Sequence, residues 1–498
     1  MAKPSPSASP NASPTPSPKP SPKFIFHQDA AHGNLSAIKH AIGSGAMDVD
    51  VRDSAGWTAL MCASIAGKLS TAKWLVRAGA NFGAKTDLGA TVLHLAATHG
   101  QLKVVRWLVH DCQVDTEVPN GGGFTALHCA VFRSHLPIIQ WLVAEGKVNV
   151  EARSLRGTTA LHGAAQNGDL AAVQCILTKA DVHAVDHQNA AALHFAARHN
   201  KLDVVQYLVT KAGADLDAKD ALGATAMHHA ALHGHLLVVQ WFVLELHMDA
   251  NMAADKGATA LYAAVKNNHL HVAKWLVEEA RADVGAKDAQ GDTALYLATE
   301  NGSLAMLECL VLGKADVNVK DILGFSVLHV ATQNGHLAVT QWLVEKAQAD
   351  VNAKTRQNAT PLMLASENGH FAVVQWLVKF GKADVEARMF HGLTTLMLAV
   401  NSRRTKVVKW LAQKAGADTR ANSELGSVVD IACRSRDRSC PDEEEEARRL
   451  VEWLARPCAR PACEARGTKK CGRCQKVRYC CRHCQAEDWA EHQQECTA

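Results

Sequence analysis

The sequence predicts an all-α repeat solenoid, a stack of helix–turn–helix units, followed by a small metal-stabilised module. Three observations support this fold class. A short motif recurs along most of the chain at a nearly constant spacing, each copy holds two helical stretches around a turn, and cysteines gather near the C-terminal end. Units of about this length bury their apolar faces only against their neighbours, so we expect an extended stack and not a single globular core.

The repeated motif has the form T-A-L-H-x-A-A, and its eleven copies start 32 to 34 residues apart. The first residues of the copies are Thr58, Thr91, Thr125, Thr159, Ala191, Thr225, Thr259, Thr293, Ser326, Thr360 and Thr394. A threonine commonly begins a helix. The small alanines that follow allow close packing, so we expect a short first helix in each copy.

A turn and a second helix follow each first helix. Nine residues after the start, most copies carry glycine and two carry Asn200 and Asn268, residues that accept the left-handed backbone conformation at a helix end. The second helix reads V-V-Q-W-L-V or close to it. Sixteen residues after each start stands a bulky or sulfur-containing side chain, which we expect to pack between repeats: Trp74, Trp107, Trp141, Cys175, Tyr207, Trp241, Trp275, Cys309, Trp342, Trp376 and Trp410.

Residues 24–455 resemble the ankyrin repeat, through T-P-L-M-L-A from Thr360 and A-D-V-N-A-K-T from Ala349. The usual proline after the first threonine occurs only at Pro361. The resemblance implies about 12 to 13 units including caps, joined by β-hairpin-like fingers, and a long groove that binds a protein partner. The finger-tip residues expected to vary for recognition include Phe82, Asp87, Ala289, Gln290, Ile322, Leu323, Arg356, Gln357, Phe390 and His391.

Two features of the repeats could suggest a metal-binding or catalytic site. The recurring histidines at His94, His128, His162, His194, His228 and His329 could form a metal ladder. In ankyrin-like units this position hydrogen-bonds neighbouring loops, so we interpret these histidines as structural. The glycines at 121–123 precede no Lys-Ser/Thr pair, and no metalloprotease, nucleophile-elbow or kinase motif is found. We therefore expect no enzyme activity.

The first 23 residues hold eight of the 14 prolines and no large apolar side chain beyond Met1, which predicts a disordered, partly polyproline II tail. Phosphorylation of its Ser-Pro and Thr-Pro pairs and a plastid-type transit peptide are alternatives to a solubilising tail. Net charge is +4, with no signal segment and no run of membrane-spanning length. Eight of the 15 cysteines lie between Cys458 and Cys496, which favours a reducing, intracellular location, cytoplasmic or nuclear.

The last repeat is irregular. It begins at Ser427, but its second helix is delayed by ten residues, so that Trp453 stands 26 residues from the start. The acids at 443–446 fall at the start of that helix and complement its dipole, which predicts a solvated capping helix. Only Arg456 and Pro457 separate this helix from the first metal-type cysteine, so we expect a stiff connection.

The cysteine cluster has the spacing C-x4-C-x7-C-x2-C-x5-C-x3-C-x7-H-x3-C. Its eight candidate zinc ligands are Cys458, Cys463, Cys471, Cys474, Cys480, Cys484, His492 and Cys496. Eight thiolate and imidazole donors match two closed tetrahedral Zn²⁺ sites of the structural kind. A module this small needs the metal to fold, at about 10 kcal/mol per site.

Residues 458–496 resemble the MYND zinc finger, through the ligand order, the pair Tyr479-Cys480 and the closing motif C-Q-x3-W-x2-H-x3-C. The resemblance implies one zinc ion on Cys458, Cys463, Cys480 and Cys484, and a second on Cys471, Cys474, His492 and Cys496. It also implies that Gln485 and Trp489 contact proline-containing peptides of a partner, although Trp489 could equally fill the small core.

Two positions depart from the family pattern. The first ligand pair is C-x4-C and not the commoner C-x2-C, which needs a wider loop over residues 460–462. Cys481 stands beside Cys480 as a ninth candidate ligand, and we expect it to be a free thiol because the three-residue interval from Cys480 to Cys484 fits the family.

Together these features predict a monomeric, non-enzymatic adaptor that holds one protein in its groove and another on its zinc finger. A ubiquitin-ligase-like protein is an alternative, but a RING motif places its histidine in the middle and His492 is the seventh of eight ligands. A nucleic-acid-associated regulator is another, although eight Lys/Arg against five Asp/Glu in the finger give only a weak phosphate-binding charge.

Overall fold

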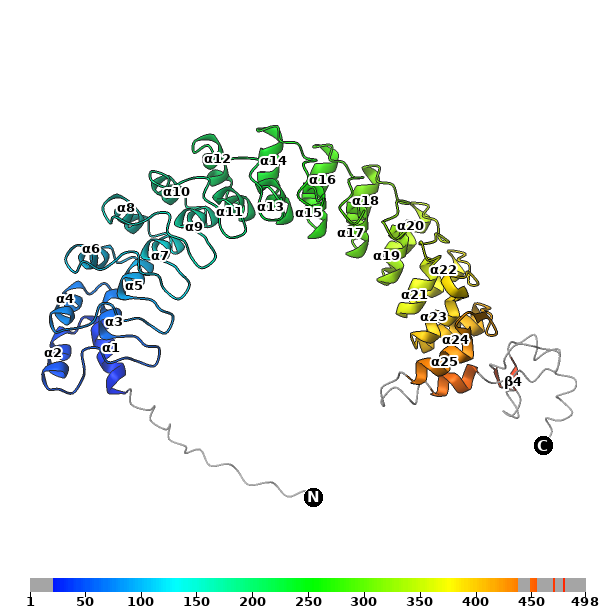
Figure 1. Ribbon diagram of the computed structural model, residues 1–498, viewed down its shortest axis with the longest axis horizontal. Helices are drawn as coiled ribbons and strands as arrows, with labels where there is room; N and C mark the ends of the chain where they lie inside the picture. The colour runs from blue at the N-terminus through cyan, green and yellow to red at the C-terminus, as the bar shows by residue number, and fades with distance from the viewer. Residues whose placement is uncertain (1–20, 438–447, 455–468, 471–477, 480–498) are drawn as a thin grey trace, which may run out of the picture. The chain divides into compact units, whose positions relative to one another are not determined.

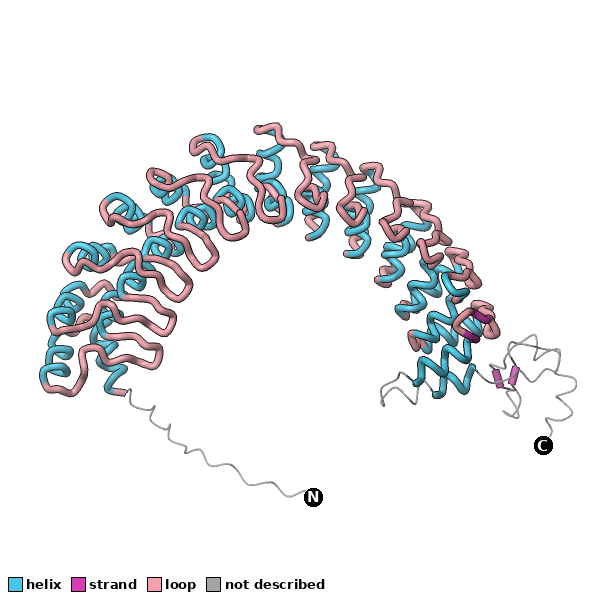
Figure 2. Tube along the Cα trace, in the orientation of Figure 1, coloured by secondary structure: helices cyan, strands magenta, loops and turns pink. Residues whose placement is uncertain are grey.

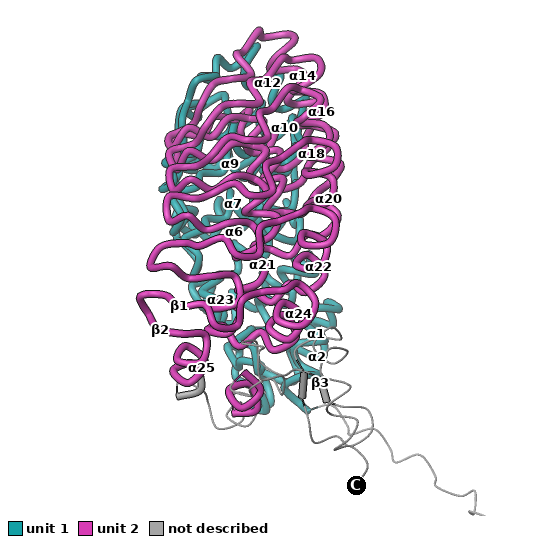
Figure 3. The backbone as a smooth tube through the Cα atoms, turned by 90° about the vertical axis from the view of Figure 1, so that its right-hand side faces the viewer, with its two compact units in different colours: residues 1–221 teal, residues 222–498 magenta. Residues whose placement is uncertain are grey.

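The structure is a computed structural model, and it describes residues 21–437, 448–454, 469–470 and 478–479. The chain divides into two compact units, residues 1–221 and 222–498 (Figure 3). Most of the predicted N-terminal tail, residues 1–23, lies outside the described residues. The first helix begins at Pro22, two residues before the expected start of the repeats.

The first unit is a run of helix pairs in which first helices stack on first helices and second helices on second helices, as α7 does on α9 and α8 on α10 (Figure 1). Its helices are α1 (Pro22–His32), α2 (Leu35–Gly43), α3 (Ala59–Ile65), α4 (Leu69–Arg77), α5 (Val92–Thr98), α6 (Leu102–His110), α7 (Ala126–Phe132), α8 (Leu136–Ala144), α9 (Ala160–Asn167), α10 (Leu170–Ile176), α11 (Ala192–Arg198) and α12 (Leu202–Thr210).

The second unit continues the same pattern. Its elements are α13 (Ala226–Leu232), α14 (Leu236–Leu244), α15 (Ala260–Lys266), α16 (Leu270–Glu278), α17 (Ala294–Glu300), α18 (Leu304–Leu312), α19 (Val327–Gln333), α20 (Leu337–Glu345), α21 (Pro361–Asn368), α22 (Phe371–Lys379), η1 (Phe390–Gly392), α23 (Thr395–Asn401), α24 (Thr405–Lys414), β1 (Asn422–Ser423), β2 (Gly426–Ser427), α25 (Val428–Asp437), β3 (Lys469–Lys470) and β4 (Arg478–Tyr479). Residues 448–454 are also helical. Strands β1 and β2 pair antiparallel, as do β3 and β4.

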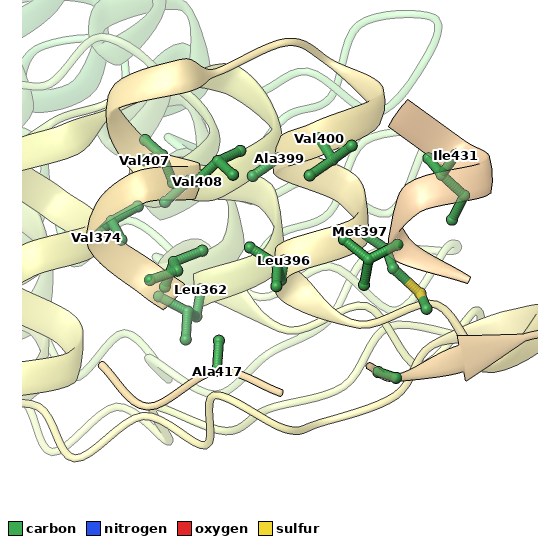
Figure 4. Close-up of a cluster of buried hydrophobic side chains, with 14 of the residues drawn as sticks. Leu362, Val374, Leu396, Met397, Ala399, Val400, Val407, Val408, Ala417 and Ile431 are labelled. Carbon is green, nitrogen blue, oxygen red and sulfur yellow. The ribbon is translucent and has the colours of Figure 1, made fainter. Parts of the chain in front are cut away.

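Within each unit the core consists of small and branched side chains buried between neighbouring repeats. In the last repeats Leu362, Val374, Leu396, Met397 and Val408 are almost completely buried and lie together in one cluster (Figure 4). Each repeat contributes such residues to both of its neighbours. Burial of apolar surface between repeats is therefore the main source of stability.

The second-helix tryptophans pack against the next repeat, as the sequence predicts. Trp107, Trp141 and Trp376 are buried. The Arg106 guanidinium from α6 lies 5.8 Å from the centre of the Trp141 ring on α8. The buried members of the series, which also include Cys309, therefore have the structural role that the sequence predicts, and the other seven positions are half-buried.

The recurring histidines tie each first helix to the following repeat. In the first unit, the Thr125 N–H donates to Nδ1 of His128 at 3.3 Å, and Nε2 of His128 lies 3.2 Å from the Thr158 carbonyl oxygen. The other five histidines of the series repeat both contacts. A backbone N–H can only donate and a carbonyl can only accept, so each ring is neutral with its proton on Nε2. The structural interpretation of the histidines is confirmed.

The residue nine positions after each repeat start has a left-handed backbone. It has positive φ in all eleven copies, including Ser134 (53°) and Arg403 (56°), where neither glycine nor asparagine is present. A side chain of the next repeat often covers this turn. His370 lies over Gly335, and its Nε2 is 2.8 Å from the Gln333 carbonyl oxygen. The turn side of the stack therefore also carries hydrogen bonds between neighbouring repeats.

We predict that stability falls when the pH is lowered from 6.5 to about 4. Burial lowers the pKa of His94 and His162, and lowers the pKa of His128 and of His329 to about 4. The unfolded chain takes up protons at these imidazoles near pH 6.5 and the folded chain does not, so the free energy of unfolding decreases over this range.

The effect is expected to reach the order of 3 kcal/mol for a residue such as His128, and urea unfolding at a series of pH values measures it. The His128→Gln variant is the control, because it has no imidazole at that position to titrate. Its stability should depend less steeply on pH than that of the unaltered chain, and equal slopes would contradict the prediction.

Candidate interaction surface

The loop before each first helix is a finger that ends in a tight turn. In the finger at 80–91, the Thr86 N–H donates to the Ala90 carbonyl oxygen at 2.9 Å, and the Gly89 N–H donates back to Thr86 at 2.8 Å. Asp or Asn often takes the place of Thr86, as in the finger of the second unit where Asp288 Oδ1 accepts from the backbone N–H of Gln290 and of Asp292. Figure 2 shows these fingers projecting in a row beside the first helices of the first unit.

Neighbouring fingers are joined by backbone hydrogen bonds at their tips. In the first unit the Gly121 N–H donates to the Leu88 carbonyl oxygen at 2.9 Å, and in the second unit Arg356 donates to Leu323 at 3.0 Å. The approach is close, since a Cβ atom on Gly89, whose φ is +74°, would lie 2.7 Å from the Gly121 nitrogen. The tips are thus held on a fixed backbone and do not move independently of one another.

The structure exposes all ten side chains that the sequence singled out for recognition. Nine of them lie at finger tips. Phe82 does not, because it lies in the earlier turn formed by residues 81–83, where the Gly83 N–H donates to Asn81 Oδ1 at 2.8 Å. The expectation that Phe82 is a tip residue is therefore wrong, although its ring is exposed.

Several exposed tip residues were missed by the sequence reasoning. Leu88 and Leu155 in the first unit are 82% and 70% exposed, and Leu222 in the second unit is 71% exposed. Each stands one or two residues before the glycine that closes the tip turn. The sequence signal for these residues is an apolar side chain one or two positions before the tip glycine. Leucines elsewhere in the repeats are mostly buried, so a leucine at this position stands out.

One part of the second unit carries uncompensated negative charge. In the two repeats that start at 259 and 293, tyrosine replaces the recurring histidine, and the Tyr262 hydroxyl donates to Asp288 Oδ2 at 2.8 Å. Partial burial, together with the carboxylates of Asp288, Asp321 and Glu300, raises the pKa of Asp292 to about 6. Burial and the same acidic neighbourhood raise the pKa of Tyr296 to about 12. The finger side therefore favours cationic ligands here.

The turn side of the first unit has a hollow of about 530 Å³, lined by Phe132, Arg133, Ser134, Gln166, Asn167, His199 and Lys201. At this turn the link to the preceding repeat is made by Asn167, whose Nδ2 donates to the Val131 carbonyl oxygen at 2.7 Å. Asp169 occupies the position from which His370 and its equivalents reach back to the preceding repeat, but its carboxylate instead accepts from the Ala172 N–H of its own helix at 3.1 Å. Phe132 is left 70% exposed.

The predicted zinc ligands and peptide contacts all lie outside the described residues: Cys458, Cys463, Cys471, Cys474, Cys480, Cys484, Gln485, Trp489, His492 and Cys496. The strand pair β3–β4 is described within this region. Lys469 pairs with Tyr479 and Lys470 with Arg478. Because the strands are antiparallel, the chain leaves β3 just before Cys471 at one end of the ladder and leaves β4 just before Cys480 at the other end.

Comparison with protein families agrees with this architecture. The family model for ankyrin repeats (three copies) matches overlapping segments at 26–120, 69–153, 127–220, 161–252, 193–288, 227–321, 280–355 and 328–423. The model for the MYND finger matches residues 458–496. The chain therefore belongs to the ankyrin repeat family, and it carries a MYND finger at its C-terminal end. Modules of both kinds are typically non-catalytic and mediate protein–protein interactions.

Among solved structures, the chain is similar to the crystal structure of the ankyrin repeat domain of Bcl-3, a protein described as a unique member of the IkappaB family. The two chains are 30% identical, the match covers 41% of this chain and 91% of the other, and the TM-score is 0.37.

No group of three or more His, Cys, Asp or Glu side chains among the described residues is arranged to hold a metal ion. The described helices include none that combines the length and the apolar character needed to cross a bilayer.

We predict that Asp292→Asn stabilises the protein at pH 7.5. The pKa of this carboxyl is raised in the fold, so the folded state resists its ionisation and stability is lost as the pH rises from 3.8 to about 6. An uncharged amide removes that repulsion. Urea unfolding should show a gain at pH 7.5 and none at pH 4.

The matched control is Glu279→Gln, which removes an exposed charge immediately after α16. It should leave stability nearly unchanged at both pH values. A destabilised Asp292→Asn variant at pH 7.5 would show that the carboxylates are not in mutual repulsion.

Proposed function

We propose that this protein is a two-ended, non-enzymatic adaptor whose ankyrin fingers bind one partner and whose zinc finger binds a second. The observation that carries the proposal is the row of exposed side chains on hydrogen-bonded, rigid finger tips, in a chain that also matches a MYND finger. Rigid presentation lowers the entropy cost of binding an extended protein surface. The adaptor acts as a monomer in the cytoplasm or nucleus.

The ankyrin end supplies apolar anchors and charge. Leu88 and Leu155 can bury apolar surface of a partner on the first unit, and Ile322, Leu323 and Phe390 can do so on the second. The carboxylates around Asp292 select a partner segment rich in Lys or Arg for the second unit. Binding at that position should therefore weaken as the salt concentration rises.

The C-terminal end binds two zinc ions through the eight ligands named above, with Cys471 and Cys474 on one ion and Cys480 and Cys484 on the other. This division is the one that the similarity to the MYND finger implies. Zinc supplies the folding energy of the module, and Cys481 does not take part. Gln485 hydrogen-bonds the backbone of an extended peptide and Trp489 packs against its proline.

We predict two zinc ions per chain, measured by elemental analysis of the purified full-length protein. Cys480→Ser should lose zinc, because a tetrahedral site with a missing thiolate binds the metal much more weakly. Cys481→Ser, one residue away, is the matched control and should keep both ions. Equal loss from the two variants would show that Cys481 is a ligand, and one ion per chain would contradict the two-site assignment.

Affinity capture from native lysate tests the two-ended function. The full chain, a chain that ends at Arg456 and the full-length Trp489→Ala variant are compared by mass spectrometry. We predict that one set of proteins is lost in both variants while another set remains, because the zinc finger and the fingers of the stack bind different partners. The Cys481→Ser protein serves as the control and should capture both sets.

An unchanged set of captured proteins would assign all recognition to the ankyrin surface and overturn the second binding end. Two further assays address the alternative functions. Autoubiquitination with a charged conjugating enzyme would favour a ubiquitin-ligase-like protein, and salt-sensitive retention on DNA would favour a nucleic-acid-associated one.

A further inference from the structure

Three kinds of hydrogen bond join the finger side of one repeat to the next. They are the backbone bonds between tips, the contacts of the recurring histidines, and a side-chain bond at the base of the finger. In the last kind, the Asp283 N–H donates to Asn251 Oδ1 at 2.7 Å, and the Asp384 N–H donates to Asn352 Oδ1 at 2.9 Å. Among the described repeats, every junction has at least one of these links, with a single exception in the second unit.

The exception lies between the finger tips at 288–292 and 321–325, and we call it the open junction. Within the described residues the Ile322 N–H has no hydrogen-bond partner, although the equivalent N–H in the next finger has one. The two tips also stand farther apart. A Cβ atom on Gly291 would lie 3.4 Å from the Ile322 nitrogen, whereas one on Gly324 would lie 2.8 Å from the nitrogen of the equivalent residue.

The other two links are missing because of the side chains present. Tyr296 stands where a histidine would reach the next finger, and its hydroxyl has no hydrogen-bond partner within the described residues. Gly285 stands at the position of Asn251 and has no side chain to accept from the Asp316 N–H. The finger side of the open junction therefore lacks all three links.

The turn side of the same junction stays closed. Nε2 of His336 lies 2.9 Å from the Glu300 carbonyl oxygen. The first helices α17 and α19 stack on each other (Figure 1), and Leu295 on α17 and Leu328 on α19 are almost completely buried. A movement at this junction is therefore a one-sided opening at the fingers and not a separation of the two repeats.

Negative charge collects at the open junction. Asp292 takes the last position of its tip, which is uncharged in all the other fingers. Partial burial and neighbouring carboxylates, those of Asp288 and Asp321 among them, raise the pKa of Asp292 to about 6. The lysines beside the two tips, Lys287 and Lys320, form no ion pair with any carboxylate of the described residues. The carboxylates therefore repel one another without a cation between them.

We propose that the open junction is a hinge built into the second unit. Its finger side opens and closes while its turn side stays closed, and repulsion among the carboxylates of Asp288, Asp292 and Asp321 favours the open form. The movement changes the separation of the tips at 288–292 and 321–325. The hinge is a property of the unbound chain and does not depend on the proposed adaptor role. A partner that contacts both tips would select one separation.

Amide hydrogen exchange of the zinc-loaded full-length chain at neutral pH, resolved by residue, tests the proposal. The amides of Asp321 and Gly324 are bonded within their own finger, as are their equivalents Thr355 and Asn358 in the next one. After correction for intrinsic rates, we expect exchange to be at least about tenfold faster in the first pair, because each missing hydrogen bond contributes about fivefold to local opening. Helix α19 should remain as protected as α21. Equal protection of the two fingers, or equally fast exchange in α19, would overturn the proposal.

Substitutions that restore a link test the cause of the opening. Tyr296→His restores the recurring histidine, and Gly285→Asn supplies an acceptor for the Asp316 N–H. The backbone at Gly285 is not left-handed, so it accepts a side chain. Each variant should slow exchange of the same two amides about fivefold. Asp292→Asn should slow it as well, because it removes one of the repelling charges.

The matched controls are Tyr262→His and Gly83→Asn. They are the same substitutions at equivalent positions of junctions that already have a tip bond, and both should leave exchange of the two amides unchanged. The hinge is contradicted if neither link-restoring variant slows exchange, or if the controls slow it equally. An Asp292→Asn variant that exchanges like the unaltered chain would contradict the role of the carboxylates.

Discussion

The contact between one repeat and the next is the interaction on which everything else in this protein depends. No single unit of about 33 residues has a core of its own, so its valines, leucines and alanines are buried only when a neighbour is present. Polar links run parallel to this apolar layer. The recurring histidines, the finger-tip backbone bonds and the turn-side side chains all join one repeat to the following one. Each therefore loses its partner if the stack opens locally.

The same periodicity explains where the binding features lie. Inside a repeat, almost every position is constrained by packing or by one of these links. The side chains just before the finger-tip glycines are not constrained in this way. Hydrogen bonds hold their backbone, and the side chains extend away from the stack. Leucines can remain exposed there, as Leu88 and Leu222 do. Recognition is thus concentrated at positions where the fold holds the backbone in place but packing does not restrict the type of side chain.

Departures from the repeat pattern are as informative as its regularities. Asp169 caps its own helix, and a hollow lies beside this turn although Asn167 still bridges to the preceding repeat. Tyrosines in place of two histidines accompany the acidic part of the second unit. Arg403 takes the left-handed position that most other repeats give to glycine and places a guanidinium at that turn. In each case a residue that breaks the local rule changes the charge or shape of the surface at that point, while the core remains intact.

The sequence alone determined the repeat period, the helix pairs, the structural role of the histidines and the ankyrin and MYND families, because these depend on local spacing and residue type. It also predicted most of the exposed tips. It misplaced Phe82 and missed Leu88, Leu155 and Leu222, because whether an apolar side chain is buried depends on the neighbouring finger. The raised pKa of Asp292 likewise required the tertiary structure, because its largest cause is burial and Asp321 of the next finger adds to it, and stacking decides both.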